Sequence, residues 1–519
     1  MKKKNALKSK KEKAPQNKKA RRIFLYLVVF GAGVSVLAIE LAASRLLAPY
    51  FGSSIFVWGN IIGTILIALS LGYWIGGKLA DQHPNVEYLM YLLIAAGILT
   101  SLIPLLFQLY TKLAAVNFSF LTFLIAGSFL AMILLFFFPV FLLGMVSPFA
   151  IRIMISDLKS SGKTAGSLYA FSTLGSIVGT FLSAFILIPF WGTKETIYLS
   201  ALILLFFSAW GLKKKPVFFL LILIPIVLYF VTKGDNIKSV AGLIYEKESP
   251  YQFIQIIKKD KRYELRVNDG WGLQSIYDPN SILVNSYYDD YSVLPYFEHP
   301  NRAKDVLLIG VGGGTISRQY LAFFQDRISL NIDAVEIDPG VIKAAQQYFD
   351  LAQQPISIHI SDGRAFLEKA NQRYDILIVD AYSQQIYIPF HLTTREFFNV
   401  TKSHLKEKGI LAINVNAASR DSELLNRILQ TLKSVYAHVY LSPLGEGYNW
   451  LVLASESNLD LGGMKQSVDN PILQPVANEV ISGFEEIKAD SRYPVLTDNK
   501  APVELLTEKE IFDYLFKKS

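Results

Sequence analysis

The sequence predicts a polytopic α-helical membrane bundle of about seven spans, followed by a small β-domain and an α/β domain with a parallel sheet. The 519 residues have a mean hydropathy of +0.33 and are 52% hydrophobic and 18% charged, whereas soluble domains are about 45–50% apolar and about 25% charged. The apolar excess lies almost entirely in the first half of the chain, and strands alternate with helices in the second half. Together these observations exclude a purely soluble protein.

Residues 1–22 form a basic segment that we expect to be a disordered cytoplasmic tail. They contain eleven Lys and Arg against one Glu, a net charge of +10, so the rest of the chain has a net charge of −2 although the whole chain has +8. A core with this balance does not fit nucleic-acid binding. Because the chain has no cysteine, disulfides, thiolate metal sites and a cysteine nucleophile are also excluded.

Residues 23–233 are expected to form the transmembrane domain of a multi-pass cell-membrane protein, because apolar stretches of about 20 residues span a hydrocarbon core of about 30 Å. The predicted spans are residues 24–47, 55–77, 88–109, 119–147, 166–190, 196–212 and 216–232. Two glycine pairs predict faces for close helix packing; they are Gly72 with Gly76 and Gly175 with Gly179. The long stretch at residues 118–151 and the short last segment are the places where a re-entrant or double crossing is an alternative.

Residues 234–519 have the composition of a soluble part, with 29 basic and 37 acidic side chains. Residues 234–300 are expected to be β-rich, because three short alternating or apolar segments are separated by turn sequences. These segments are residues 252–257, 263–267 and 273–276.

Residues 301–519 are expected to form a Rossmann-like, nucleoside-binding domain. Its predicted strands are residues 306–309, 332–337, 356–360, 376–380, 410–415, 439–441 and 450–454, with helical segments between them. Mostly apolar strands with helical crossovers predict a parallel, doubly wound sheet, which binds its ligand at the carboxyl ends of the strands.

Glycines or acids follow four successive strands of this predicted sheet. In chain order they are Gly310, Gly312, Gly313 and Gly314; Glu336 and Asp338; Asp362 and Gly363; and Asp380. Glycines let backbone approach a ligand closely, and an acid about 22 residues later can accept hydrogen bonds from both hydroxyls of a ribose. One acid after a strand is usually a helix cap, but four strand ends in this order predict nucleoside binding.

Residues 251–454 resemble the spermidine synthase family, the polyamine aminopropyltransferases, which join a small β-domain to a class I methyltransferase-like fold. The matching segments are residues 309–314, 335–341, 362–364, 374–380 and 393–398. With the first half included, the chain resembles bacterial membrane proteins that fuse a transporter-like bundle to a spermidine synthase domain, on residues 72–81, 166–175 and 496–504.

This resemblance implies transfer of an aminopropyl group from the adenosyl sulfonium decarboxylated S-adenosylmethionine, the co-substrate, to a small amine such as putrescine. It makes Asp380 the catalytic carboxylate that orients and helps to deprotonate the amine, while Glu336 holds the ribose and Asp362 the adenine. The other implied cofactor-binding residues are Gly310, Gly312, Gly314, Asp338 and Gly363, and the implied substrate-binding residues are Gln274, Tyr287 and Tyr382. Ordinary packing is the alternative role of the two tyrosines. No metal is implied, and a homodimer is an open alternative to a monomer.

Two positions depart from the family pattern. Gly313 stands where the family usually has an aspartate for the aminopropyl nitrogen, and Ser383 stands where it has a second acid for the diamine. Losing one charged contact in a partly buried site costs about 2–5 kcal/mol unless another group replaces it. The acids that could compensate are Asp289, Asp290 and Asp498.

Three functions therefore stay open. The first is a membrane-anchored aminopropyltransferase of polyamine biosynthesis, and the second is an S-adenosylmethionine-dependent methyltransferase-like enzyme with another acceptor. The third is a polyamine or small-solute transporter with a nucleoside-sensing domain, which the few polar residues within the spans disfavour. The basic residues share one side of the membrane if all seven spans cross once, which puts the C-terminal part outside the cell and conflicts with a cytosolic co-substrate.

Overall fold

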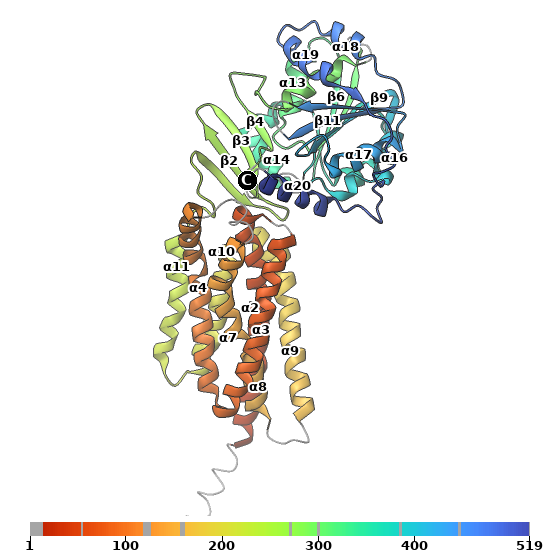
Figure 1. Cartoon of the computed structure of the whole chain (residues 1–519). Helices are drawn as coiled ribbons and strands as arrows, with labels where there is room; N and C mark the ends of the chain where they lie inside the picture. The colour runs from red at the N-terminus through yellow and green to blue at the C-terminus, as the bar shows by residue number, and fades with distance from the viewer. Residues whose placement is uncertain are drawn as a thin grey trace, which may run out of the picture. The chain divides into compact units, whose positions relative to one another are not determined.

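The computed structural model of the chain describes residues 14–52, 55–117, 126–155, 161–268, 272–297, 302–382, 387–444 and 448–517. These residues form two compact units, one ending at Lys238 and the other beginning at Ser239 (Figure 1). The β-rich section shares the second unit with the α/β section, so it does not form a compact unit of its own. The expected disordered tail is helical from Ala14 onward, and its first 13 residues lie outside the described residues.

The first unit is an all-helical bundle. Its elements are α2 (Ala14–Phe51), α3 (Ile55–Gln82), α4 (Val86–Asn117), α6 (Ser128–Ala131), the π-helix η2 (Met132–Phe137), α7 (Phe138–Gly144), α8 (Val146–Met154), α9 (Ser161–Leu182), the π-helix η4 (Ser183–Trp191), α10 (Thr193–Gly211), the 3₁₀-helix η5 (Pro216–Ile222) and α11 (Leu223–Thr232).

Five stretches of this bundle are long and apolar enough to cross a membrane: Lys19–Phe51, Phe56–Gln82, Val86–Leu113, Ser128–Met154 and Ser161–Trp191. The last two predicted spans coincide with α10 and with η5 plus α11, which are not among the five. Ser128–Met154 forms one helical stretch although it contains two prolines. Pro139 has no N–H to donate to the preceding turn, and the π-helix η2 before it provides wider turns at this point.

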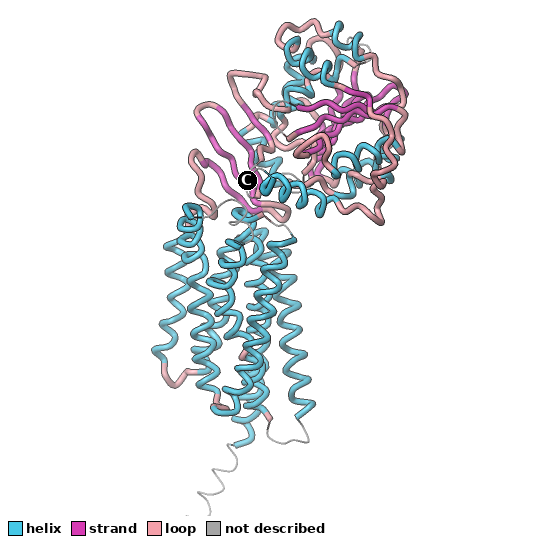
Figure 2. The backbone as a smooth tube through the Cα atoms, in the orientation of Figure 1, coloured by secondary structure: helices cyan, strands magenta, loops and turns pink. Residues whose placement is uncertain are grey.

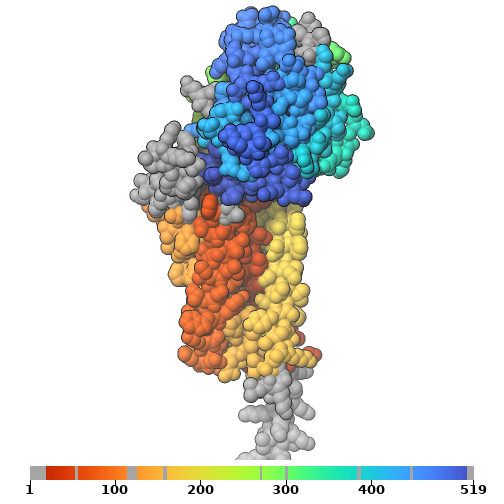
Figure 3. All heavy atoms as spheres, turned by 45° about the vertical axis from the view of Figure 1, so that its right-hand side comes forward, coloured from red at the N-terminus to blue at the C-terminus, as the bar shows by residue number. Residues whose placement is uncertain are grey.

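The predicted glycine faces pack directly against neighbouring helices. A Cβ atom on Gly175 or Gly179 would lie 2.2 Å or 2.4 Å from carbonyl oxygens of α2, and one on Gly72 would lie 2.3 Å from the carbonyl oxygen of Phe141. Only glycine allows backbones to approach so closely. In contrast, the outer side of α9 and η4, yellow in Figure 3, exposes large apolar side chains such as Phe181 and Phe185.

The second unit begins with a four-stranded antiparallel sheet. Its strands, in spatial and chain order, are β1 (Leu243–Glu248), β2 (Phe253–Lys259), β3 (Arg262–Val267) and β4 (Ser275–Tyr277). Three of them match the predicted segments, whereas β1 was not expected, because its sequence Leu-Ile-Tyr-Glu-Lys-Glu is half charged and forms an edge strand.

The α/β section contains an eight-stranded sheet in the order β12-β10-β11-β9-β8-β5-β6-β7. Its strands are β5 (Lys304–Ile309), β6 (Leu330–Glu336), β7 (Ser357–Ile360), β8 (Tyr374–Val379), β9 (Leu405–Asn416), β10 (His438–Leu444), β11 (Asn449–Ser455) and β12 (Glu485–Glu486). The five adjacent strands β9, β8, β5, β6 and β7 all run parallel to one another. The prediction of a fully parallel sheet is wrong at the other end, where β11 is antiparallel to both β9 and β10.

The reversal at β11 has a simple cause. Leu444 of β10 pairs with Asn449 of β11, and a connection this short can only make a hairpin, because a parallel crossover needs a dozen or more residues.

Helices cover both faces of this sheet (Figure 2). They are α12 (Tyr288–Tyr291), η6 (Leu294–Tyr296), α13 (Thr315–Phe324), α14 (Pro339–Tyr348), η7 (Leu351–Gln353), α15 (Gly363–Leu367), η8 (Phe390–Leu392), α16 (Arg395–Ser403), α17 (Glu423–Lys433), α18 (Leu461–Ser467), α19 (Gln474–Gly483) and α20 (Val503–Lys517). Separate apolar cores fill the two faces, one under α13 and α19 and the other under α16 and α17. The strand order reverses at β5, between β6 and β8, which is where such sheets bind ligands.

Candidate active site

The glycine loop lies at this reversal and requires glycine for two reasons. Gly310, Gly312 and Gly314 have φ angles of +90°, +52° and +79°, which only glycine adopts without strain. A Cβ atom on Gly310 would also lie 2.3 Å from the carbonyl oxygen of Asp380, because the ends of β5 and β8 touch. The Asp380 N–H donates to the Ile309 carbonyl at 2.9 Å, which fixes the two strand ends together.

Glu336 ends β6 and points its carboxylate at the glycine loop. Its oxygens accept hydrogen bonds from the backbone N–H groups of Gly312 at 3.2 Å and Asp338 at 3.1 Å. The residue is 9% exposed, and this burial raises the pKa of Glu336 to about 7, although the two backbone donors oppose the shift. A buried carboxylate with free acceptor sites beside a glycine loop can hold ribose hydroxyls.

Asp338 follows β6 and precedes α14. It is fully buried, and its side chain caps α14 by accepting the Gly340 N–H at 2.8 Å. Its other oxygen accepts the Ser249 hydroxyl at 2.6 Å, which ties the small sheet's section to the larger one. These contacts give Asp338 a structural role as a helix cap.

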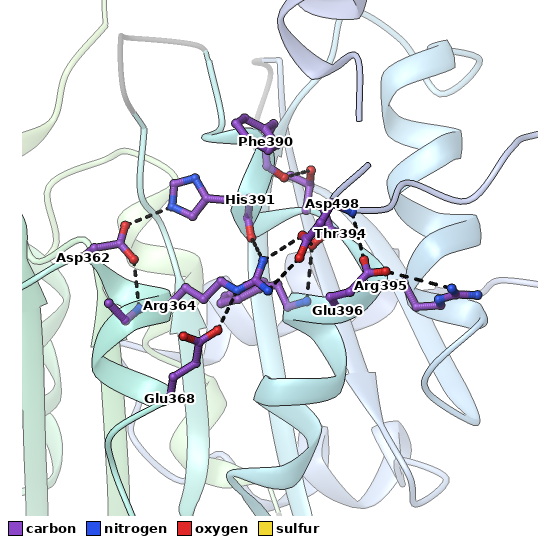
Figure 4. Close-up of polar contacts among 12 residues, drawn as sticks. Asp362, Arg364, Glu368, Phe390, His391, Thr394, Arg395, Glu396 and Asp498 are labelled. Atoms are coloured by element: carbon purple, nitrogen blue, oxygen red, sulfur yellow. Dashed lines mark hydrogen bonds and ion pairs between the residues drawn. The ribbon is translucent and has the colours of Figure 1, made fainter. Parts of the chain in front are cut away.

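Asp362 and Gly363 lie at the end of β7 and the start of α15. Asp362 caps α15 by accepting the Ala365 N–H at 2.9 Å, and its second oxygen lies 2.9 Å from Nε2 of His391 (Figure 4). The hydrogen bond from His391 is the largest cause that lowers the pKa of Asp362. Gly363 is needed because a Cβ atom there would lie 2.3 Å from Ile309, directly before the glycine loop.

Asp380 follows β8 and is the central carboxylate of the site. The Tyr287 hydroxyl donates to one of its oxygens at 3.1 Å, and the Asn414 side-chain amide donates to the other at 3.1 Å. Burial raises the pKa of Asp380 to about 6, while the two donors act in the opposite direction. Asp380 is therefore mostly ionised at neutral pH but close enough to titration to exchange a proton.

Tyrosines surround Asp380. Tyr287 stacks on Tyr288 with ring centroids 4.1 Å apart, and the Tyr382 hydroxyl donates to the Asn414 carbonyl at 2.9 Å. Burial raises the pKa of each of these tyrosines and of Tyr291 well above 10, so all four stay neutral. The backbone of Gln274 lies against the glycine loop, 2.8 Å from where a Cβ atom of Gly312 would be.

Two positions depart from the family pattern, and the structure describes the surroundings of Gly313. A Cβ atom on Gly313 would lie 2.7 Å from Phe349 and 2.7 Å from Ser275, whose hydroxyl accepts the Gly313 N–H at 2.6 Å. An aspartate therefore has no room at position 313. Ser383 lies outside the described residues.

Two of the three acids named as replacements are engaged elsewhere. Asp289 accepts from the backbone of Val284 and Asn285 and from the Gln319 amide, and Asp498 is paired with Arg364 at 2.8 Å. Asp290 is the third, and its pKa is raised to about 7 by burial and by its acidic neighbours Asp289 and Glu479. Within the described ranges, no group of three His, Asp or Glu residues is arranged to hold a metal ion.

Sequence reasoning missed two polar residues of the site. Asn414 is 2% exposed and follows the apolar residues of β9. A polar residue after the apolar part of a fifth parallel strand could have indicated a site residue. His391 comes from η8, between β8 and α16, and no pattern in the sequence brings it to Asp362.

Comparisons with known proteins find similarity in the C-terminal unit. The family model described as Spermine/spermidine synthase domain matches residues 285–455. The chain is 31% identical over 286 residues to a probable polyamine aminopropyl transferase of Bifidobacterium longum (strain NCC 2705), a match that covers 51% of this chain and 62% of that protein. It therefore spans less than two thirds of the length of that relative.

Two further proteins are similar. The polyamine aminopropyltransferase of Vibrio vulnificus (strain CMCP6) is 28% identical over 312 residues, covering 54% of this chain and 98% of that one. The crystal structure of a probable spermidine synthase from Corynebacterium glutamicum ATCC 13032 aligns with a TM-score of 0.39 and 16% identity, over 50% of this chain and 97% of that one. The family match and the two relatives thus make the C-terminal unit of the chain similar to the spermine/spermidine synthase family.

Proposed function

We propose that the C-terminal unit transfers an aminopropyl group from decarboxylated S-adenosylmethionine to an amine acceptor such as putrescine, a reaction of polyamine biosynthesis. The observation that carries this proposal is the position of Asp380, a carboxylate with a pKa of about 6 at the strand end that touches the glycine loop. The names of the relatives from Bifidobacterium longum and Vibrio vulnificus support the same chemistry.

The reaction needs little covalent help from the protein. The nitrogen of a neutral amine attacks the carbon next to the sulfonium, a C–N bond forms, and the C–S bond breaks with its electron pair going to sulfur, which releases methylthioadenosine. The product ammonium then loses a proton. Because the sulfonium is already a good leaving group, positioning and deprotonation of the amine are the steps left to the protein.

Asp380 is the residue suited to both steps. Tyr287 and Asn414 donate to its two oxygens and so fix their direction, and the remaining acceptor capacity of the carboxylate can take an N–H of the amine. The second polar atom of the Asn414 amide, Oδ1, is buried and has no hydrogen-bond partner within the described part of the chain. It offers a second acceptor for the same amine.

The nucleoside would bind on the other side of the glycine loop. Glu336 has the burial and the position to accept the ribose hydroxyls, and Asp362 lies at the neighbouring strand end to meet the adenine edge. The glycine loop supports close approach of the ligand to the backbone. Asp338 supports the shape of this region as the cap of α14.

Product analysis with both donors tests the proposal. Purified full-length protein is incubated with putrescine and either decarboxylated or intact S-adenosylmethionine, and the products are identified by mass spectrometry. We expect an aminopropylated amine and methylthioadenosine with the decarboxylated donor alone. A methylated product with the intact donor would instead support the methyltransferase-like alternative.

We further propose that the helical unit anchors the enzyme in the cell membrane by seven crossings. The 3₁₀-helix η5 rises about 2.0 Å per residue and α11 about 1.5 Å, so the 17 residues Pro216–Thr232 reach about 29 Å, close to the hydrocarbon thickness of about 30 Å. Their outward side chains, including Leu220, Val227 and Phe230, are apolar and exposed.

Contacts within this unit support alternating crossings. At one end, which we call the basic end, Arg152 pairs with Asp81 at 2.7 Å and Lys215 with Glu87 at 3.2 Å. At the other end, Lys194 donates to the carbonyl of Asp235 at 2.7 Å. Helix α10 therefore runs toward the basic end and α11 runs away from it.

The last residues of the unit lie far from the basic end. Lys238 donates to the Pro49 carbonyl at 2.8 Å, and the Tyr50 hydroxyl donates to the Ile237 carbonyl at 2.9 Å, both at the end of α2 that is opposite to its basic beginning. Since basic loops stay in the cytoplasm, the C-terminal unit begins on the non-cytoplasmic side. Its donor and acceptor would then have to be supplied there.

The cysteine-free sequence allows a clean test of this topology. Single exposed cysteines are introduced by Gln82→Cys at the basic end, Asn236→Cys at the other end and Lys261→Cys in the C-terminal unit. In right-side-out membrane vesicles, a membrane-impermeant maleimide should label the last two directly and the first only after lysis. The reverse pattern would contradict the topology and leave the proposed reaction untouched.

A further inference from the structure

The carboxylate of Asp362 is held on both oxygens but remains accessible. Oδ1 accepts the Ala365 N–H at 2.9 Å and Oδ2 lies 2.9 Å from Nε2 of His391. A carboxylate has about four acceptor positions, and this side chain is 34% exposed. Asp362 can therefore accept a further hydrogen bond from a ligand without losing either internal one.

The segment that carries His391 is itself fixed by an ion pair. Arg364, on the helix that Asp362 caps, forms a two-pronged contact with Asp498 at 2.8 Å for both nitrogen–oxygen pairs (Figure 4). Asp498 also accepts the hydroxyl of Thr394 at 2.7 Å, and Arg364 reaches the His391 carbonyl at 3.5 Å.

The backbone reinforces this arrangement. The Arg395 N–H donates to the Leu496 carbonyl at 2.9 Å, and the Asp498 N–H donates to Glu396 at 3.1 Å. The segment 496–498 thus joins α15 to the start of α16. A paired guanidinium and carboxylate gives geometric specificity in addition to affinity.

We propose that His391 is a positioning residue that makes Asp362 select adenine, and that the Arg364–Asp498 pair holds the segment carrying His391. This inference rests on the proposed function, because it concerns the nucleoside part of the same site. His391 donates from Nε2 to Asp362, which keeps the carboxylate as an acceptor that faces the exocyclic amino group of adenine.

The chemistry of the base makes this testable. Adenine presents an amino donor at position 6, whereas hypoxanthine presents a carbonyl acceptor, which would face the acceptor Asp362. A site built to receive a donor disfavours the analogue that lacks it, because the hypoxanthine carbonyl and the Asp362 carboxylate would be two acceptors with no hydrogen between them. If His391 no longer fixes Asp362, the carboxylate can turn away and this discrimination falls.

The experiment measures binding of methylthioadenosine and of the same compound with hypoxanthine, by calorimetry on the full-length protein in detergent. We expect the wild type to prefer adenine by about 100-fold or more, and His391→Ala to lower this ratio about tenfold, in line with the loss of one charge-assisted hydrogen bond. His391→Gln, whose amide nitrogen can occupy the place of Nε2, should restore most of the ratio. Asp498→Asn should have an intermediate effect.

A matched control is His438→Ala. His438 pairs with Glu486 at 2.8 Å in the same kind of contact, but on β10 and β12, at the opposite edge of the sheet. Its loss should leave the preference for adenine unchanged.

The outcomes separate the inference from the proposed function. Absence of methylthioadenosine binding by the wild type would remove the proposed nucleoside site. Binding by the wild type with an unchanged ratio in His391→Ala, including equal weakening of both ligands, would overturn the inference and leave His391 a structural residue. Thermal unfolding of each variant verifies that it is folded.

Discussion

The half of the site that we propose binds the nucleoside and the half that we propose binds the acceptor are built in different ways. In the nucleoside half, Glu336 and Asp362 are held by backbone N–H groups and by His391. In the acceptor half, Asp380 lies among neutral tyrosines, and the hydroxyl of Tyr291 is buried without a hydrogen-bond partner among the described residues. The first half follows from strand ends that every sheet of this type shares, whereas the second is assembled from side chains of distant segments. The proposed acceptor half therefore depends more on long-range packing than the proposed nucleoside half does.

The largest expected effect is that of Asp380→Asn, which should impair turnover but leave nucleoside binding nearly unchanged. Asp380→Asn keeps the shape of the side chain but removes the base, so kcat should fall about 10²–10⁴-fold, while the dissociation constant of methylthioadenosine stays within about threefold of the wild type. Steady-state kinetics and calorimetry check the two parts. A variant that keeps more than a tenth of the wild-type kcat would show that Asp380 is not the base.

The second effect falls on the nucleoside half. Glu336→Gln removes the charge that accepts the ribose hydroxyls, and hydrogen bonds to charged groups contribute about 1.5–3 kcal/mol. We expect the methylthioadenosine dissociation constant to rise about 10–100-fold, with a smaller change in kcat. Calorimetry measures the dissociation constant.

Asp338→Ala is the comparison for Glu336. Asp338 is a helix cap, so its loss should lower the free energy of unfolding by about 0.5–2 kcal/mol with little change in the dissociation constant of the folded protein. A large rise in that constant with unchanged stability would return Asp338 to the cofactor-binding residues.

The third effect concerns Gly313 in the glycine loop. Gly313→Asp restores the acid that the family usually has, but the new side chain meets Phe349 and Ser275. Overpacking of this kind lowers the free energy of unfolding by about 1–3 kcal/mol, and we expect no gain in putrescine affinity. Denaturant unfolding checks this, with Gly462→Ala as a control where the nearest atom to a new Cβ is 3.6 Å away. Tighter putrescine binding by Gly313→Asp would mean that the site tolerates a second carboxylate.

The smallest effect tests the surroundings of Asp380. Because a base acts only when it is ionised, and the pKa of Asp380 is about 6, kcat/KM should rise with pH through about 6. Tyr287 donates to the ionised form and lowers this pKa, so Tyr287→Phe should move the acidic limb to higher pH by less than about one unit. A limb that stays in place or moves to lower pH would contradict the role of this contact.

The positions of the residues that follow the parallel strands could be predicted from the sequence. Apolar runs end at Ile309, Glu336, Ile360 and Val379, so the residues directly after them had to share one edge of a parallel sheet. That logic gave Gly310, Glu336, Asp362 and Asp380 their positions. It also grouped Asp338 with them, and the structure shows that this side chain caps α14.

Other features depended on contacts that no local pattern contains. The contact of His391 with Asp362 and the crowding around Gly313 involve segments that are distant in the chain. The direction of β11, in contrast, follows from its short connection to β10, which the prediction of a parallel sheet did not take into account. The edge strand β1 has too few apolar residues to be recognised.

The sequence by itself determined the division into an apolar helical part and an α/β part, together with the positions of the strand-end residues in the proposed nucleoside half of the site. Hydrophobic periodicity and strand ends are local properties, and each can be recognised from a short stretch of consecutive residues. Only the tertiary structure decided that Asn414 and Tyr287 meet at Asp380, that position 313 has no room for an acid, and that Arg364 and Asp498 hold the segment of His391. These depend on packing between elements up to 134 residues apart, and packing is a property of the whole fold.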